Sequence, residues 1–192
     1  MFGTRLSTSP EGKFPFIYPV EPVPRTAVLV PWFRQDMGLA AFKAGGSRSA
    51  RGVRIRIFRS GWSREAAEWA PAAVAGRLDQ LLALDPYELG CLTHAQIALR
   101  RAAEPPVSER DRALLWERFG VPVYEQVIGK NGDLLASECE THRGLHVYAS
   151  EPDADWFRSD WVEETDLCPC GRSARLIIPM AAQVRAAAAG TG

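Results

Sequence analysis

Apolar and polar residues alternate over several short stretches of the chain, and such alternation is typical of strands. Residues 53–58 read Val, Arg, Ile, Arg, Ile, Phe, and this period of two predicts a strand with one apolar and one basic face. Other short apolar runs lie beside Pro, Gly or polar residues. They predict further strands at residues 26–30, 121–128, 134–137, 145–148 and 175–178.

A helical period appears in the first half of the chain. The apolar positions that repeat at i, i+4, i+7 and i+8 are Val74, Leu78, Leu81 and Leu82. They predict one buried face on a helix over residues 63–84, with Ser63 as its cap and Pro71 as a break. Thr93 and Gln96 have capping-box spacing, which predicts a second helix over residues 93–103.

A third helix is predicted to begin at Ser108 and end at Gly120, a residue type that commonly ends helices. Its inward residues would be Leu114, Leu115 and Phe119. Helices between strands indicate an α/β domain, with α+β as the alternative.

The chain has 192 residues, of which 46% are hydrophobic, so it can form one domain with a substantial core. We expect the domain to span residues 26–179. Residues 1–25 contain five prolines and are expected to form an extended arm. Residues 180–192 are rich in alanine and have few bulky apolar residues, so we expect a flexible tail.

The formal net charge is zero, which argues against nucleic acid as a partner. Residues 1–60 carry ten Lys or Arg against three acids, a local balance of +7. No apolar run approaches the roughly 20 residues of a membrane span, and the N-terminus is polar, without the apolar core of a signal peptide. We therefore expect the cytoplasm, where thiols stay reduced and clustered cysteines more often bind metal than form disulfides.

Three cysteines and two histidines in the C-terminal half have a spacing that suits zinc. They are Cys139, His142, His146, Cys168 and Cys170. Zinc in structural sites takes four thiolate or imidazole ligands in a closed tetrahedron. Three thiolates and one imidazole meet that requirement, so we expect one structural Zn²⁺ clamping residues 134–178. The residues alone leave either histidine open as the fourth ligand.

Several short sequence motifs, which follow one another in the same order, resemble those of the phenylacetate–CoA ligase family of adenylate-forming enzymes. They are Phe119-Gly120 with Tyr124, Glu138-Cys139, Gly144-Leu145-His146, and Cys168-Pro169-Cys170-Gly171-Arg172. The resemblance covers roughly residues 108–178. It implies part of the large N-terminal domain of such a ligase, with a small zinc-stapled β region. It also implies Cys139, His146, Cys168 and Cys170 as ligands, with His142 as a neighbour.

The chain departs from this family at the residues of catalysis. The resemblance places the family's Mg²⁺-binding acid on Asn131, and a neutral amide cannot balance a divalent cation as a carboxylate does. Residues 45–49 (Gly-Gly-Ser-Arg-Ser) are the candidate phosphate loop but lack the family's Thr/Gly run. The family's C-terminal domain, with its catalytic lysine, has no counterpart in the 192 residues.

These departures predict a non-catalytic accessory protein that binds another protein, with nucleotide or acyl-CoA as weak ligands. The alternative is a split or minimal adenylate-forming enzyme that a second chain completes.

Overall fold

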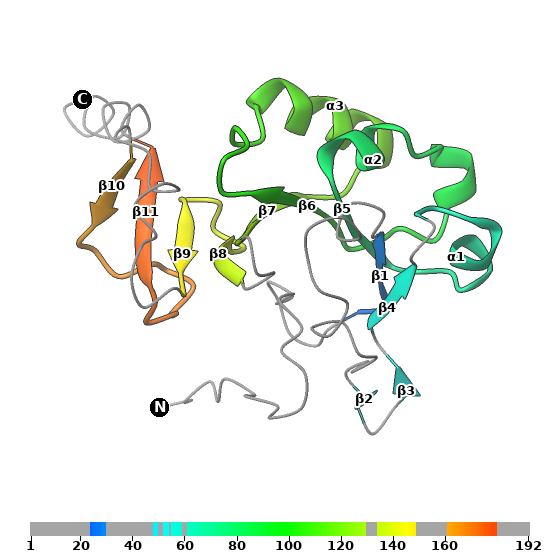
Figure 1. The fold of residues 1–192 in the computed structure, drawn as a ribbon, viewed down its shortest axis with the longest axis horizontal. Coiled ribbons are helices and arrows are strands. Elements are labelled where there is room, and N and C mark those ends of the chain that lie inside the picture. Colours follow the sequence, from blue (N-terminus) through cyan, green and yellow to red (C-terminus); the bar gives the residue numbers. More distant parts are fainter. Residues whose placement is uncertain are drawn as a thin grey trace.

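One nine-stranded sheet organises the chain (Figure 1). The computed structural model describes residues 24–29, 48–49, 52–53, 55–58, 61–129, 134–148 and 161–179. The strand order of the nine-stranded sheet is β10-β11-β9-β8-β7-β6-β5-β1-β4, and β2 pairs with β3 in a separate two-stranded sheet. The strands are β1 (Thr26–Leu29), β2 (Arg48–Ser49), β3 (Gly52–Val53), β4 (Ile55–Phe58), β5 (Ala73–Gly76), β6 (Ala95–Arg101), β7 (Val123–Ile128), β8 (Leu134–Glu138), β9 (Leu145–Val147), β10 (Trp161–Glu164) and β11 (Arg175–Pro179).

The large sheet has a parallel and an antiparallel half, joined at β7. Strands β4, β1, β5, β6 and β7 pair in parallel. Strands β8, β9, β11 and β10 continue the sheet in antiparallel fashion. The helical elements are α1 (Arg64–Glu68), α2 (Leu78–Leu82), the 3₁₀ turn η2 (Pro86–Leu89) and α3 (Glu109–Phe119). The mixed α/β class expected from the sequence is confirmed.

Helices cover one face of the parallel half. Figure 1 shows α2 and α3 on the same side of β5, β6 and β7. Leu81 of α2 and Leu115 of α3 are fully buried there against Val74 and Ala98 of the strands. Burial of this apolar surface is the main stabilising contribution to the parallel half.

Helix α3 forms as the sequence predicts. The Ser108 hydroxyl accepts a hydrogen bond from the Asp111 amide at 3.1 Å, and Gly120 ends the helix in the left-handed region at φ 65°. Leu115 is buried and Phe119, one turn later, is partly buried. The prediction for Leu114 is wrong, because its side chain is 43% exposed. Adjacent helical residues point about 100° apart, so one of this leucine pair turns outward.

Two of the predicted helices are wrong in extent or type. Ser63 does cap a helix, with its hydroxyl accepting from the Ala66 amide, but that helix, α1, has only five residues. The chain then forms strand β5, which contains Val74, before α2 begins. Residues 95–101, expected to be helical, form β6, a central strand of the sheet.

The antiparallel half agrees closely with the predicted strands at residues 134–137, 145–148 and 175–178. Gly144, just before β9, lies so close to β11 that a Cβ there would be 2.2 Å from the carbonyl oxygen of Ile177. Only glycine fits this approach. Gly144 therefore lets the turn after β8 lie against β11.

Several expectations fall outside the described residues. They include most of the Pro-rich arm (residues 1–23), the tail (180–192), residues 45–47 of the candidate phosphate loop, and Asn131. Within the part of the chain that the structure describes, no helix combines the length and apolar character needed to cross a bilayer.

Candidate metal centre

Three cysteines and one histidine come together on the antiparallel half of the sheet. Cys139 directly follows β8, His146 lies in β9, and Cys168 and Cys170 occupy the turn before β11. One ligand atom from each of the four lies within 4.8 Å of the others. Cys139, His146 and Cys168 are buried and Cys170 is half-buried. A buried cluster with this composition can bind a metal ion.

Strand register explains why these side chains meet. His146 pairs with Ser137 of β8 and with Leu176 of β11. Because side chains alternate across a strand, all three point to the same face of the sheet. Cys139, Cys168, Leu176 and Ile178 form one buried cluster on that side. Gly171, with φ 76°, donates its amide to the carbonyl of Cys168 at 2.9 Å and closes the turn that holds two of the thiols.

The distances within the cluster suit a tetrahedral zinc ion. Zn–S bonds of about 2.3 Å place two sulfurs of a tetrahedron about 3.8 Å apart. The Sγ atoms of Cys139 and Cys168 are 3.6 Å apart, and Cys170 Sγ is 3.2 Å from His146 Nε2. A disulfide requires sulfurs about 2.05 Å apart, so Cys139 and Cys168 are not bonded to each other.

The other ring nitrogen of His146, Nδ1, is positioned by a hydrogen bond. His146 Nδ1 lies 3.2 Å from the carbonyl oxygen of Ala174, which can only accept a hydrogen bond. Nδ1 therefore carries the proton, and the Nε2 lone pair faces the thiols. Histidines that bind metals commonly have such a second hydrogen bond, which fixes the tautomer and the ring orientation.

Neighbouring polar groups make the thiols chemically unequal. Burial alone raises the pKa of Cys168, but hydrogen bonds from the Thr141 hydroxyl and the Cys170 amide outweigh it and lower the pKa to about 6. Burial, followed by the neighbouring thiols, raises the pKa of Cys170 to about 12. Three thiolates at this spacing repel one another, so a divalent cation is the group that allows all three to ionise.

His142, the alternative fourth ligand, lies outside this cluster. Its Nδ1 is 3.0 Å from a carboxylate oxygen of Glu138, and its ring stacks on Tyr124 with centroids 4.7 Å apart. Its φ of 50° is unusual for a residue with a side chain. Burial, followed by the charges of Glu140 and Glu138, raises the pKa of Tyr124. Of the two histidines, the structure brings His146 to the thiols.

Sequence reasoning missed a buried network of charged side chains on the opposite face of the sheet. Glu125 is 2% exposed and lies 2.5 Å from the Arg100 guanidinium and 3.5 Å from that of Arg112. Arg112 also contacts Glu138 at 3.0 Å, and Glu138 precedes Cys139 in the chain. Glu125 lies inside the apolar run at residues 121–128 that predicted a strand. Because buried charges are normally paired, this glutamate could have indicated a buried ion pair.

Comparison with known proteins supports the fold. The chain matches no protein-family model and no curated protein. Among solved structures it is similar to an open conformation of 2-hydroxyisobutyryl-CoA ligase in complex with 2-HIB-AMP and CoA, at 17% identity and a TM-score of 0.53. A second structure of that ligase, in the thioesterification state, gives 18% identity and a TM-score of 0.47.

The fold resembles part of this CoA ligase. Both matches cover 83% of this chain, which spans only 44% of the length of the ligase. Identity at this level supports the fold and not an activity. The resemblance to phenylacetate–CoA ligases in particular stays a prediction.

Proposed function

We propose that this chain is a zinc-stabilised, non-catalytic protein that retains part of the phenylacetate–CoA ligase fold and binds another protein in the cytoplasm. The four ligands of the zinc are Cys139, His146, Cys168 and Cys170. The observation that carries the proposal is the approach of these four ligand atoms to within 4.8 Å of one another.

The zinc has a structural role. Catalytic zinc sites keep one coordination position open for water or substrate, whereas structural sites use four protein ligands. Here three thiols and an imidazole supply all four positions. The ion joins the end of β8, the strand β9 and the turn before β11, which are held together otherwise by short strand pairings and small buried clusters.

The loss of catalysis rests on residues that the family resemblance identifies. Asn131 replaces the acid that holds Mg²⁺, and the run from Gly45 to Ser49 is a poor phosphate loop. Without a cradle for phosphates and a counterion for magnesium, the chain lacks the groups that stabilise the charge of the transferring adenylate.

Purified protein should therefore release no pyrophosphate from ATP with any of a panel of carboxylic acids. An active acyl-CoA ligase serves as the positive control. Asp133, two residues after Asn131, is the nearest carboxylate that could replace the missing acid. Pyrophosphate release that survives further purification and falls in an Asp133→Asn variant would contradict the proposal, because it would originate in this chain.

The second candidate is a split adenylate-forming enzyme. The observation that favours it is the match to 44% of a CoA ligase, because the phosphate loop and the catalytic lysine could then belong to another polypeptide. In that case ATP-dependent thioester formation appears only when the two proteins are mixed.

A further inference from the structure

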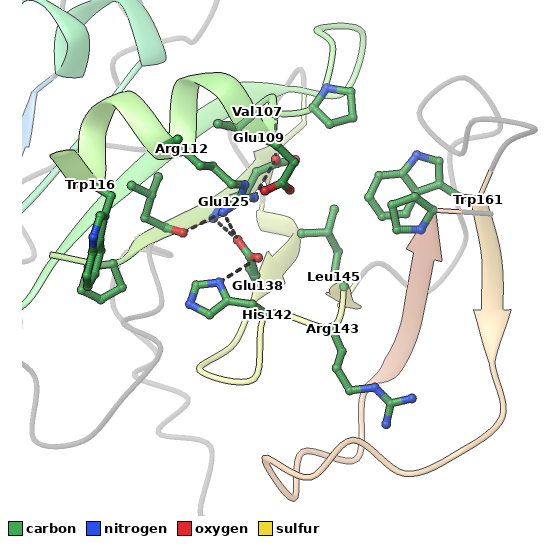
Figure 2. Close-up of a pocket in the computed structure, with 16 residues that line it drawn as sticks. Val107, Glu109, Arg112, Trp116, Glu125, Glu138, His142, Arg143, Leu145 and Trp161 are labelled. Carbon is green, nitrogen blue, oxygen red and sulfur yellow. Dashed lines mark hydrogen bonds and ion pairs between the residues drawn. The ribbon is translucent and has the colours of Figure 1, made fainter. Parts of the chain in front are cut away.

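A pocket of about 620 Å³ lies beside α3, on the side of the sheet opposite the thiol cluster. The N-terminal part of β7, the end of β8 and the turn before β9 line it together with α3. Figure 2 shows Trp116 and Trp161 at opposite ends of this pocket. Pockets of several hundred Å³ suit small organic ligands.

Strand register defines the floor of the pocket. Glu138 pairs with Leu145, Leu145 with Ile177, and Trp161 with Pro179. By alternation, the side chains of Leu145, Trp161 and Pro179 share one face of the sheet with Glu138, and His146 points to the other. The pocket and the thiol cluster are therefore separate sites on the two faces of the antiparallel half.

The cations that line the pocket are already neutralised. Arg112 donates to the carbonyl of Val123 at 2.7 Å and to Glu138 at 3.0 Å, and it also contacts Glu125. Arg143 pairs with Glu164 at 3.3 Å, and Figure 2 shows its guanidinium turned away from Glu138. An anionic ligand would thus have to break an existing ion pair.

One carboxylate at the pocket remains without a cation. Glu125 and Glu138 are balanced by Arg100 and Arg112. Glu109, in the first turn of α3, lines the pocket and has no ion-pair partner among the described residues. His142 Nδ1 already lies 3.0 Å from a carboxylate oxygen of Glu138. The charge left available to a ligand is therefore the carboxylate of Glu109.

We propose that this pocket binds a small organic cation, an amine or amidine carried on an apolar body. Glu109 supplies the opposite charge. The walls suit the apolar part, because they include Leu145, Val123 and two tryptophans. Trp116, which is 56% exposed, offers an indole ring that can also attract a cation through its π face.

This inference extends the proposed binding role to a second site, whose lining includes none of the four zinc ligands. Amine binding by protein that contains no metal would refute the zinc assignment and leave the pocket assignment intact. Stoichiometric zinc without amine binding would refute the pocket assignment and leave the zinc assignment intact.

Three probes of similar shape separate charge from apolar contact: 2-phenylethylamine, 2-phenylethanol and 3-phenylpropanoate. Binding to the full chain is followed at pH 8 through the indole N–H signals in ¹H–¹⁵N NMR spectra, assigned with Trp116→Phe and Trp161→Phe variants. An alkylammonium stays charged there, as lysine does with a pKa of about 10.4. We expect the amine to bind with a Kd near about 1 mM, about tenfold tighter than the alcohol, with the carboxylate weakest.

Glu109→Gln should abolish the preference for the amine, while Glu117→Gln, on an exposed part of the same helix outside the pocket, should leave it unchanged. Far-UV circular dichroism checks that both variants keep their helices. The proposal is overturned by equal binding of amine and alcohol, by tighter binding of the carboxylate, or by an amine preference that survives in Glu109→Gln. It is also overturned if no probe shifts the signals of Trp116 or Trp161 at about 20 mM, well above the expected Kd.

Discussion

Replacing Cys170 with serine should lower the free energy of unfolding by about 3–5 kcal/mol, because loss of a metal site is among the few single changes that destabilise a protein this strongly. Cys170 Sγ lies 3.2 Å from His146 Nε2, and a serine hydroxyl is a poor zinc ligand in its place. Loss of one ligand would open the clamp between β9 and the turn before β11. Urea denaturation followed by tryptophan fluorescence measures the change.

Cys91→Ser is the matched control. Cys91 is half-buried like Cys170, but it lies outside the cluster of potential ligands. We expect that variant to lose less than about 1 kcal/mol, as small changes of partly exposed side chains usually do. Equal losses of stability in the two variants would mean that Cys170 contributes only as a packed side chain. That result would contradict a zinc ion that joins β9 to the turn before β11.

Glu125→Gln should destabilise the protein by about 3–5 kcal/mol, because removal of one partner leaves a buried charge uncompensated. Arg100 has 8% of its side chain exposed and depends on Glu125 for its counter-charge. The second carboxylate oxygen of Glu125 also accepts the amide of Val107 at 2.9 Å, so the same residue ties β7 to the segment before α3. Thermal and urea unfolding of the variant, compared with the native chain, give the loss.

The control for this variant is Glu65→Gln, which removes one partner of the exposed Arg56–Glu65 ion pair. Surface ion pairs contribute up to about 1 kcal/mol, so this change should be small. If Glu125→Gln were as mild as Glu65→Gln, water would have to solvate Arg100, and the network would not be buried as described.

The sequence predicted elements with clear local signals. The Ser108 cap and the Gly120 stop define α3, and both signals act within one turn of the chain. The strands at residues 134–137, 145–148 and 175–178 carry turn residues at their ends and were placed within one or two residues of β8, β9 and β11. The sequence predicts an element correctly where residues close in sequence determine its conformation.

Of the strands that the sequence did not predict, β5 and β6 lie in the middle of the sheet. Their residues are buried on both faces, so the period of two that identifies a half-exposed strand is not present. Ala, Leu and Arg of β6 favour helices by intrinsic propensity, and the four leucine and valine positions from Val74 to Leu82 imitate a helical stripe. Pairing with β1 and β7 overrides these preferences.

The cysteine cluster was accessible from sequence because its residue types are chemically distinctive. Spacing did not reveal which histidine lies beside the thiols, since the position of His146 depends on strand register and on the hydrogen bond to the Ala174 carbonyl. The pairing of Arg100 with Glu125 was also out of reach. It joins residues 25 positions apart on neighbouring parallel strands, and the local sequence does not encode their register.

The metal content of the native protein tests the central claim most directly. Elemental analysis of protein purified without chelator should find one zinc ion per chain, bound by three thiols that resist alkylation until a chelator removes the metal and the antiparallel half unfolds. Protein without bound metal, whose thiols react freely while its fold withstands chelator, would contradict the account.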